Sequence, residues 1–85
     1  MTGDAHALEA RLLDFLRSEL DVDLPDLDAD TALVTTGLVD SVGMVRMATF
    51  VERELGVRIP DREITVEHFD TVRRVLAYVE RGRPR

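Results

Sequence analysis

The sequence predicts an all-α fold, a small bundle of helices with one long loop before the second helix. Apolar residues recur at spacings of three and four in several separate stretches, which is the period of an amphipathic helix. The period is lost between residues 21 and 40, and no stretch alternates with period two for long enough to indicate a strand. The 85 residues, of which 45% are hydrophobic, allow one small domain with a limited core.

The first helix is expected to begin near Asp4, whose side chain can cap it, and to run to about Leu20. Its apolar residues form one stripe that faces the core: Leu8, Leu12, Phe15, Leu16 and Leu20. Residues 21–40 mix acids, small apolar residues and a proline, which is typical of a long loop. We expect Asp30 to cap one short turn through residues 33–34 and so to pin the loop to the core.

A second helix fits Ser41 to Leu55, and Gly56 would end it as a C′ residue. Its predicted inward residues are Val45, Ala48, Val51 and Leu55, with Met44 and Met47 beside them. Pro60 biases the link before it away from helix, so we expect this link to be extended, with Val57 and Ile59 buried.

A short third helix is expected within residues 61–69, and a last helix follows it. Candidate inward residues of the third helix are Ile64, Val66 and Phe69. Asp70 can cap the last helix, and Gly82 and Pro84 end it. The apolar stripe of the last helix comprises Val72, Val75, Leu76 and Val79. These stretches together predict a bundle whose helices bury one face each.

Charge is distributed unevenly along this acidic chain, whose formal net charge is −6. Residues 1–40 carry ten acidic residues and two arginines, whereas residues 41–85 carry seven acidic residues and nine arginines. An acidic chain repels nucleic-acid phosphates, so we expect no nucleic-acid partner. No apolar run is long enough for a bilayer and the N-terminus lacks a signal-peptide pattern, so we expect a cytoplasmic protein without a membrane partner. The chain has no cysteine, so any thiol chemistry would arrive on a prosthetic group.

The acidic loop does not fit a metal site. An EF-hand needs oxygen ligands at fixed offsets, with glycine at the sixth position and an acid at the twelfth. Counted from Asp21 or from Asp26, the glycine position holds an acid or a threonine instead. His6 and His68 are far apart in sequence, with no second pair of ligands at metal spacing. We therefore predict a solvated loop and no metal.

The segment Gly37-Leu38-Val39-Asp40-Ser41 stands directly before the second helix. Asp40 is a favoured N-cap residue, because its carboxylate can accept hydrogen bonds from the first free backbone N–H groups. Ser41 then lies in the first turn, with its hydroxyl outward at the positive end of a helix dipole. This position suits a hydroxyl that is presented to a phosphate-bearing partner.

A catalytic role for Ser41 is disfavoured. A serine hydrolase needs a general base, an orienting acid and an oxyanion hole. Only His6 and His68 are available as bases, neither in a recognisable context, and the Gly-x-Ser-x-Gly elbow is absent. A chain this short also leaves little room for a substrate cleft. We predict no enzyme activity and no catalytic residues.

Three segments together resemble the acyl and peptidyl carrier proteins: Asp30-Thr31-Ala32-Leu33, Gly37-Leu38-Val39-Asp40-Ser41 and Glu52-Arg53-Glu54-Leu55-Gly56-Val57-Arg58-Ile59-Pro60. The resemblance covers roughly residues 8–80 and implies a four-helix carrier bundle, one domain over residues 1–85 with its core at about 5–82. It implies that Ser41 Oγ takes 4′-phosphopantetheine from coenzyme A through a Mg²⁺-dependent transferase, with Asp40 as part of the attachment motif. The terminal thiol of the arm would then carry an acyl or aminoacyl group as a thioester.

Departures from the fatty-acid carriers narrow this resemblance. Those carriers have a strongly acidic second helix, whereas this helix sets Arg46 and Arg53 against two glutamates. Residues 61–72 and 40–45 are similar instead to discrete aminoacyl carriers, the D-alanyl carrier proteins and the prolyl carriers of pyrrole-forming pathways. The resemblance therefore favours a stand-alone, monomeric carrier in polyketide or nonribosomal peptide biosynthesis. A D-alanyl-type or fatty-acid carrier is the alternative, and an unmodified helical adaptor is less favoured.

The implied partners are a phosphopantetheinyl transferase, an adenylating ligase or acyltransferase that loads the arm, and a downstream synthase or tailoring enzyme. Val42 and Met47, near Ser41, are candidate partner contacts, and Arg46 is a candidate to pair with an acidic patch on the ligase. Packing in the core or plain solvation explains each of these three side chains equally well from the sequence alone.

Overall fold

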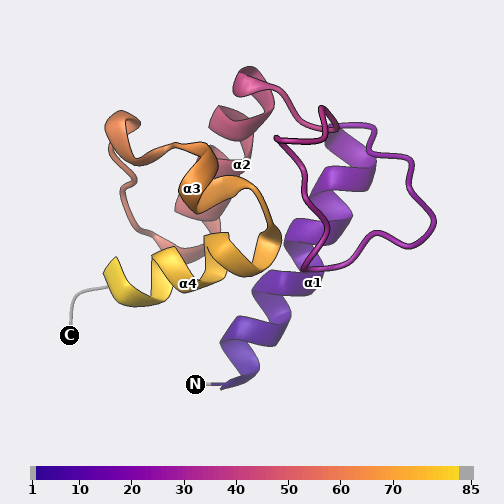
Figure 1. Ribbon diagram of the computed structural model, residues 1–85. Coiled ribbons are helices and arrows are strands. Elements are labelled where there is room, and N and C mark those ends of the chain that lie inside the picture. The colour runs from indigo at the N-terminus through magenta and orange to yellow at the C-terminus, as the bar shows by residue number, and fades with distance from the viewer. Residues whose placement is uncertain (1, 83–85) are drawn as a thin grey trace.

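The fold is an all-α bundle, as the sequence predicts (Figure 1). The computed structural model describes residues 2–82, with side chains from residue 7 onward. Its helices are α1 (Thr2–Glu19), α2 (Ser41–Leu55), α3 (Val66–Phe69) and α4 (Val72–Gly82), with a 3₁₀ turn, η1, at Asp61–Glu63. Over the described range, each helix is too short or too polar to cross a membrane. The predicted stop at Pro84 lies outside the described residues.

The core lies where α1 meets α2 and α4, and α3 packs on α4 beside it. Every helix and the long loop contribute apolar side chains to a single cluster. Burial of this shared apolar surface is the main stabilising contribution, because no single short helix would be stable alone. The largest fully buried side chains are Phe69, Leu12, Leu16, Leu33, Met47, Val51, Val72 and Val75.

Helix α1 presents the predicted stripe but differs at both ends from the prediction. It begins at Thr2, before the predicted cap at Asp4, whose side chain is outside the described set. It ends at Glu19, so Leu20 lies just beyond it, only partly buried. Asp21 follows with a φ of 55°, the left-handed conformation that commonly ends a helix and that aspartate tolerates.

Helix α2 has the predicted bounds, and Gly56 ends it with a φ of 66° and an N–H that donates to Glu52 O at 2.8 Å. Its inward face is rotated from the prediction. Val45, expected inside, is 50% exposed, and Leu55 is only partly buried. The arc that reaches the core has the spacing of one helix face: Gly43, Met44, Met47, Ala48 and Val51. Both methionines are therefore core residues.

The predicted third helix over residues 61–69 is split in two by the structure. The turn η1 comes first, and α3 itself spans one turn only. Phe69 is fully buried and Ile64 half-buried, as expected, but Val66 is 39% exposed and the inward prediction for it was wrong. The link before η1 is extended with Ile59 buried, as predicted, whereas Val57, also expected to be buried, is only half-buried.

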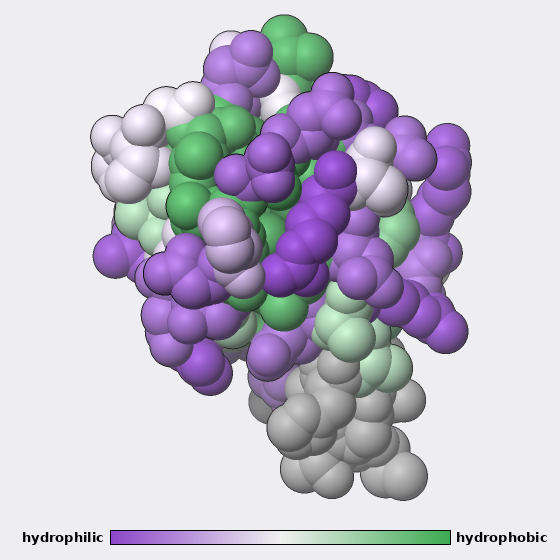
Figure 2. Space-filling model, turned by 90° about the vertical axis from the view of Figure 1, so that its right-hand side faces the viewer, coloured by the Kyte–Doolittle hydropathy of each residue, from purple (hydrophilic) through white to green (hydrophobic). Residues whose placement is uncertain are grey.

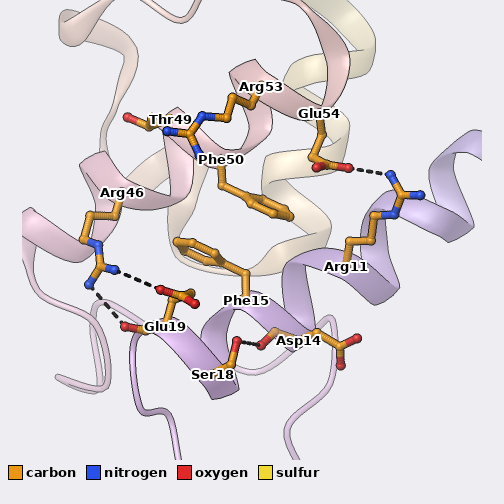
Figure 3. Close-up of a pocket in the computed structure, with 10 residues that line it drawn as sticks. All are labelled: Arg11, Asp14, Phe15, Ser18, Glu19, Arg46, Thr49, Phe50, Arg53 and Glu54. Atoms are coloured by element: carbon orange, nitrogen blue, oxygen red, sulfur yellow. Dashed lines mark hydrogen bonds and ion pairs between the residues drawn. The ribbon is translucent and has the colours of Figure 1, made fainter.

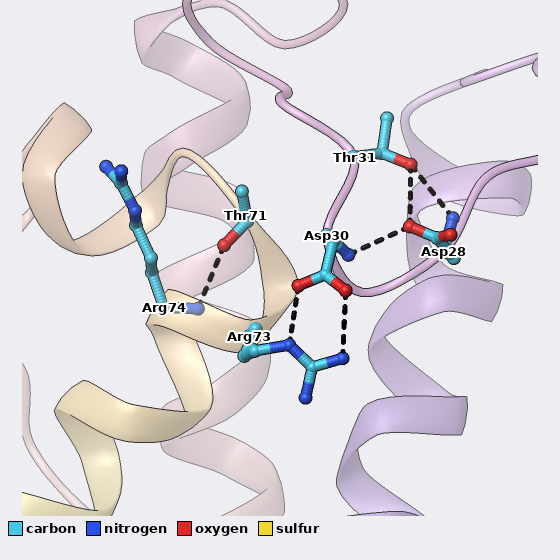
Figure 4. Close-up of polar contacts among 6 residues, drawn as sticks. All are labelled: Asp28, Asp30, Thr31, Thr71, Arg73 and Arg74. Atoms are coloured by element: carbon cyan, nitrogen blue, oxygen red, sulfur yellow. Dashed lines mark hydrogen bonds and ion pairs between the residues drawn. The ribbon is translucent and has the colours of Figure 1, made fainter.

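Thr71, rather than Asp70, caps α4. The Thr71 hydroxyl accepts a hydrogen bond from Arg74 N at 3.0 Å, and the helix begins at Val72 (Figure 4). The prediction of Asp70 as the cap was wrong, because its carboxylate is turned towards the long loop and bonded there. The stripe of α4 is as predicted, with three valines buried and Leu76 half-buried.

The long loop lies at the right of Figure 1, and apolar side chains pin it to the core. The buried anchors are Val22, Leu27, Ala29, Leu33 and Val39. Asp30 caps no helical turn, contrary to the prediction, since no helix forms there and its carboxylate pairs with Arg73 instead. Seen from that side, polar side chains cover much of the face and apolar surface shows between them (Figure 2). The loop is thus an ordered part of the bundle.

Candidate functional site

Ser41 is the first residue of α2, and its side chain is exposed. Asp40 has the extended backbone of an N-cap, with φ −94° and ψ −174°, and its Oδ1 accepts the Gly43 N–H at 2.8 Å. The backbone of Asp40 also accepts the Met44 N–H, at 2.9 Å. The predicted cap is confirmed. The serine hydroxyl therefore stands in solvent at the positive end of a 15-residue helix.

The chain approaches Ser41 through a tight turn and a buried anchor. Gly37 has a φ of 85°, which a glycine adopts without strain, and its N–H donates to Val34 O at 3.0 Å. Val39 is only 3% exposed and packs against the first turn of α2. A Cβ on Gly43 would lie 2.7 Å from Val39 Cγ1, so a side chain there would push the loop away.

Gly43 is a site residue that was not predicted, although the sequence carries a signal for it. Glycine inside a helix costs about 1 kcal/mol relative to alanine, so its presence indicates a close approach of some other group. Here that group is the Val39 side chain. The glycine leaves room for it, and the helix loses some propensity in return. The contact fixes the spacing between the loop and the helix start.

Exposed apolar side chains surround the helix start. Leu38 is 37% exposed and Val42 is 65% exposed, and Val45 continues the same outward side of α2 one turn on. Val42 is therefore placed where a partner can reach it. Met47 is fully buried, so its assignment as a partner contact was wrong: the rotation of α2 that exposes Val45 turns Met47 into the core.

Arg46 lies on the outer surface of α2 but is held by α1. Its guanidinium donates to Glu19 O at 3.2 Å and lies 3.5 Å from the Glu19 carboxylate (Figure 3). It also lies over the ring of Phe15, 6.0 Å from the centroid. Because the pair is about half exposed, an acidic group on a partner can compete with Glu19 for Arg46.

Beside Arg46, an open groove of about 670 Å³ runs between α1 and α2. Its floor is the stacked pair Phe15 and Phe50, whose ring centroids are 4.7 Å apart, and the Arg11–Glu54 ion pair, at 2.5 Å, closes one end (Figure 3). Arg53 and Thr49 line its rim. This groove could not be predicted from the sequence, because it depends on how two helices face each other.

Asp70 is the one buried acidic side chain among the residues 7–82 for which side chains are described, with 6% exposure. Its Oδ1 accepts the N–H groups of Val34 and Thr35 at 2.8 and 3.0 Å, and its Oδ2 accepts the Thr35 hydroxyl at 3.0 Å. Burial by itself raises the pKa of this carboxyl, but the hydrogen bonds from Thr35 and Val34 outweigh it, so the pKa is lowered from its ordinary value. The side chain is therefore held as a carboxylate.

A second acid ties the loop to α4 from the surface. Arg73 Nε and Nη2 donate to the two carboxylate oxygens of Asp30, at 2.5 and 3.1 Å (Figure 4). The hydrogen bond from Arg73 lowers the pKa of Asp30. Asp28 accepts the Asp30 N–H at 2.9 Å and shapes the same turn.

The histidines give no support to a nucleophilic role for Ser41. The His68 ring packs against Tyr78 in a tilted arrangement with ring centroids 4.6 Å apart, and burial together with a hydrogen bond to Glu63 raises the pKa of Tyr78 to about 12. No hydrogen bond links Ser41 to a side chain within residues 7–82, and the side chain of His6 lies outside that set. Among the described residues, no cluster of three or more His, Asp or Glu side chains is suited to a metal.

Known proteins are similar to this chain over most of its length. A family profile described as a phosphopantetheine attachment site matches residues 10–79. The D-alanyl carrier protein of Abiotrophia defectiva is 35% identical over 74 residues, which cover 87% of this chain and 94% of the relative. The D-alanyl carrier protein of Lacticaseibacillus casei is 30% identical over 76 residues, covering 89% and 94%. The probable acyl carrier protein PigG of a Serratia strain is 32% identical over 75 residues, covering 87% and 86%. No solved structure gave a significant match.

Proposed function

Because this chain belongs to the family of carrier proteins with a phosphopantetheine attachment site, we propose that it acts as one stand-alone carrier domain whose Ser41 receives that group from coenzyme A. In the proposed reaction Ser41 Oγ forms the new bond to the phosphorus of the phosphopantetheinyl group. The bond from that phosphorus to the rest of coenzyme A breaks, 3′,5′-adenosine bisphosphate leaves, and the hydroxyl proton passes to a base of the transferase. The exposed hydroxyl at the capped start of α2 is the observation that carries this proposal.

The residues around Ser41 fit such a group. The positive end of α2 favours a phosphodiester, and the Asp40 carboxylate is engaged by Gly43 N–H. Leu38 and Val42 offer exposed apolar surface beside the attachment point. When bound, the group supplies a flexible arm whose terminal thiol holds cargo as a thioester. The chain contributes rigid presentation of the attachment point and a surface for the enzymes that act on the cargo.

We propose that the cargo is an aminoacyl group such as D-alanyl. This inference is supported by two relatives that are named D-alanyl carrier proteins, each matched over nearly its whole length. We therefore favour the D-alanyl-type alternative over a carrier of polyketide or nonribosomal peptide biosynthesis. An acyl cargo is the second candidate, supported by the similarity to the probable acyl carrier protein of Serratia.

The proposed partners are a phosphopantetheinyl transferase, which modifies Ser41, and a separate adenylating ligase, which loads the arm. Val42 and Val45 provide the apolar part of the contact surface, and Arg46 provides a cation at its edge. Acidic groups on the ligase would then face Arg46. An acyltransferase takes the place of the ligase if the cargo is acyl.

The attachment site is tested by mass spectrometry after incubation with coenzyme A, Mg²⁺ and a promiscuous phosphopantetheinyl transferase. We expect a gain of one phosphopantetheinyl group, lost in Ser41→Ala and retained in Ser18→Ala. Ser18 is the matched control, because it is the only other serine and its hydroxyl is bonded to Asp14 O within α1. Modification of Ser41→Ala, or none of the wild-type chain, would overturn the proposal.

A further inference from the structure

The turn before the attachment serine is held from the far side of the bundle. Asp70 lies between α3 and α4, yet all three donors to its carboxylate belong to Val34 and Thr35. Its backbone carbonyl also accepts the Leu33 N–H at 2.7 Å. One residue thus accepts hydrogen bonds from four donor groups on three consecutive loop residues, and its side chain is almost fully buried.

These bonds continue towards Ser41. Leu33, fully buried, accepts the Val39 N–H through its carbonyl at 2.9 Å. Val39 in turn presses against Gly43 in the first turn of α2, the residue whose N–H is bonded to Asp40. The path from Asp70 to the attachment serine therefore runs through Leu33, Val39 and the N-cap. Each hydrogen bond along it has a donor–acceptor distance of 3.0 Å or less.

On the premise that Ser41 is the attachment residue, we propose that Asp70 is a positioning residue for the attachment reaction. Its carboxylate and carbonyl keep the segment from Leu33 to Asp40 in the single conformation that presents Ser41. The transferase then meets a preorganised site and does not have to select it from a mixture of loop conformations. A protein whose competent conformation is populated in a fraction f binds with an apparent dissociation constant raised by 1/f.

This role predicts a particular kinetic change. In Asp70→Ala the loop loses its acceptor, so the KM of the transferase for this carrier rises by roughly tenfold if about one molecule in ten remains competent, while kcat is unchanged. Asp70→Asn keeps one carbonyl oxygen for Val34 N–H and Thr35 N–H, and its amide can donate to the Thr35 hydroxyl. The KM of Asp70→Asn should therefore lie between those of the wild type and Asp70→Ala, which is rescue by the conservative variant.

Arg73→Ala is the matched control, because it breaks the side-chain ion pair between the loop and α4 without touching the path to Ser41. Its KM should stay within about twofold of the wild type, since exposed ion pairs hold their groups weakly. Amide hydrogen exchange gives a readout independent of any transferase. Exchange of the Val39 and Gly43 amides should accelerate in both Asp70 variants and stay at the wild-type rate in Arg73→Ala.

The outcomes separate this inference from the proposed function. If the wild type is modified at Ser41 but folded Asp70→Asn and Asp70→Ala show the wild-type KM and the wild-type exchange at Val39, the positioning role of Asp70 is refuted alone. If the wild type takes no phosphopantetheine, the proposed function itself fails. Where Asp70→Ala does not fold, Asp70→Asn and Thr35→Ala, which removes only the hydroxyl donor, carry the test by the same two measurements.

Discussion

Two aspartates tie the long loop to the start of α4, and they do so in opposite surroundings. Asp30 pairs with Arg73 on the surface, where the two side chains are 66% and 63% exposed. Asp70 is 6% exposed and accepts only uncharged donors, two backbone N–H groups and one hydroxyl. Both residues were expected to cap helical segments, and neither does.

The difference shows which kind of contact orders a loop. An exposed ion pair gains modest Coulomb energy in water, and its side chains, above all the long arginine, lose conformational freedom in forming it. A buried carboxylate is different. If it is removed, its hydrogen-bond donors stay buried without an acceptor, and the full desolvation penalty of those donors is lost from the free energy of unfolding. We therefore expect the end of the loop nearest Ser41 to depend on Asp70 and the middle of the loop, around Asp30, to depend mainly on its apolar anchors, Leu27 and Ala29.

The largest expected effect is that of Asp70→Ala on stability. The substitution leaves the Val34 N–H, the Thr35 N–H and the Thr35 hydroxyl without their acceptor in a part-buried site. We expect the free energy of unfolding to fall by about 3 kcal/mol and Tm by roughly 15 °C. Thermal unfolding followed by far-UV circular dichroism measures both.

Asp70→Asn is the control for this substitution. It keeps the shape of the side chain and one acceptor oxygen, so its loss of stability should be less than half that of Asp70→Ala. A Tm for Asp70→Ala within about 2 °C of the wild type would contradict the contrast between the two aspartates, because the buried tie would then contribute no more than an exposed one.

The contrast also explains what could be predicted from the sequence. The Asp40 cap was predicted because its partner, Gly43, is three residues away and helix starts have a local pattern. The partner of Asp70 lies 36 residues away, and nothing near Asp70 distinguishes it from an ordinary N-cap. Thr71, which caps α4 instead, is also a favoured cap residue, so the local pattern allowed both.

The same limit applies to the helix faces. The bounds of α2 follow from a cap and a terminal glycine, both of which are local signals. Its rotation is set by the helices that it packs against, so Val45, predicted to face inward, is exposed, and Met47, predicted as a candidate partner contact, is buried. Ser41, the proposed attachment residue, could be predicted because it stands at a local signal, the capped start of a helix. The groove between Phe15 and Phe50 was not, because it arises only from packing.

A smaller effect is expected from pH. The pKa of Asp70 is lowered in the folded protein, so its contribution to stability is present in full above the unfolded value of about 3.9 and is lost as pH falls through the folded pKa. Asp70→Asn lacks this titration. The difference in unfolding free energy between the wild type and Asp70→Asn should therefore be constant from about pH 7 to pH 5 and should shrink below about pH 4.

Urea unfolding of both proteins over this pH range measures that difference directly. Asp30→Asn is the comparison, since the pKa of Asp30 is also lowered but its partner is a solvated arginine. If the difference in unfolding free energy between the wild type and Asp70→Asn stays the same down to about pH 3, the hydrogen bonds from the loop do not depend on the charge of Asp70.

The smallest expected effect is that of breaking the Asp30–Arg73 ion pair on the surface. Arg73→Ala removes the guanidinium from Asp30 but leaves the Arg73 backbone N–H, which donates to Ala29 O at 2.9 Å, in place. The loop therefore keeps a backbone bond to α4 as well as its buried anchors. We expect a Tm close to that of the wild type in low salt and no difference at about 1 M sodium chloride, where charges are screened within about 3 Å.

A double-mutant cycle of Asp30→Asn and Arg73→Ala, measured by Tm at low and high salt, isolates this pair from the rest of the loop. If the surface tie is as weak as its exposure indicates, the coupling between the two substitutions is small at low salt and disappears at high salt. A coupling as large as the loss in Asp70→Ala, and unaffected by salt, would mean that the geometry of the Asp30–Arg73 pair orders the loop by itself. The two aspartates would then hold the loop equally strongly, and burial would not be what distinguishes them.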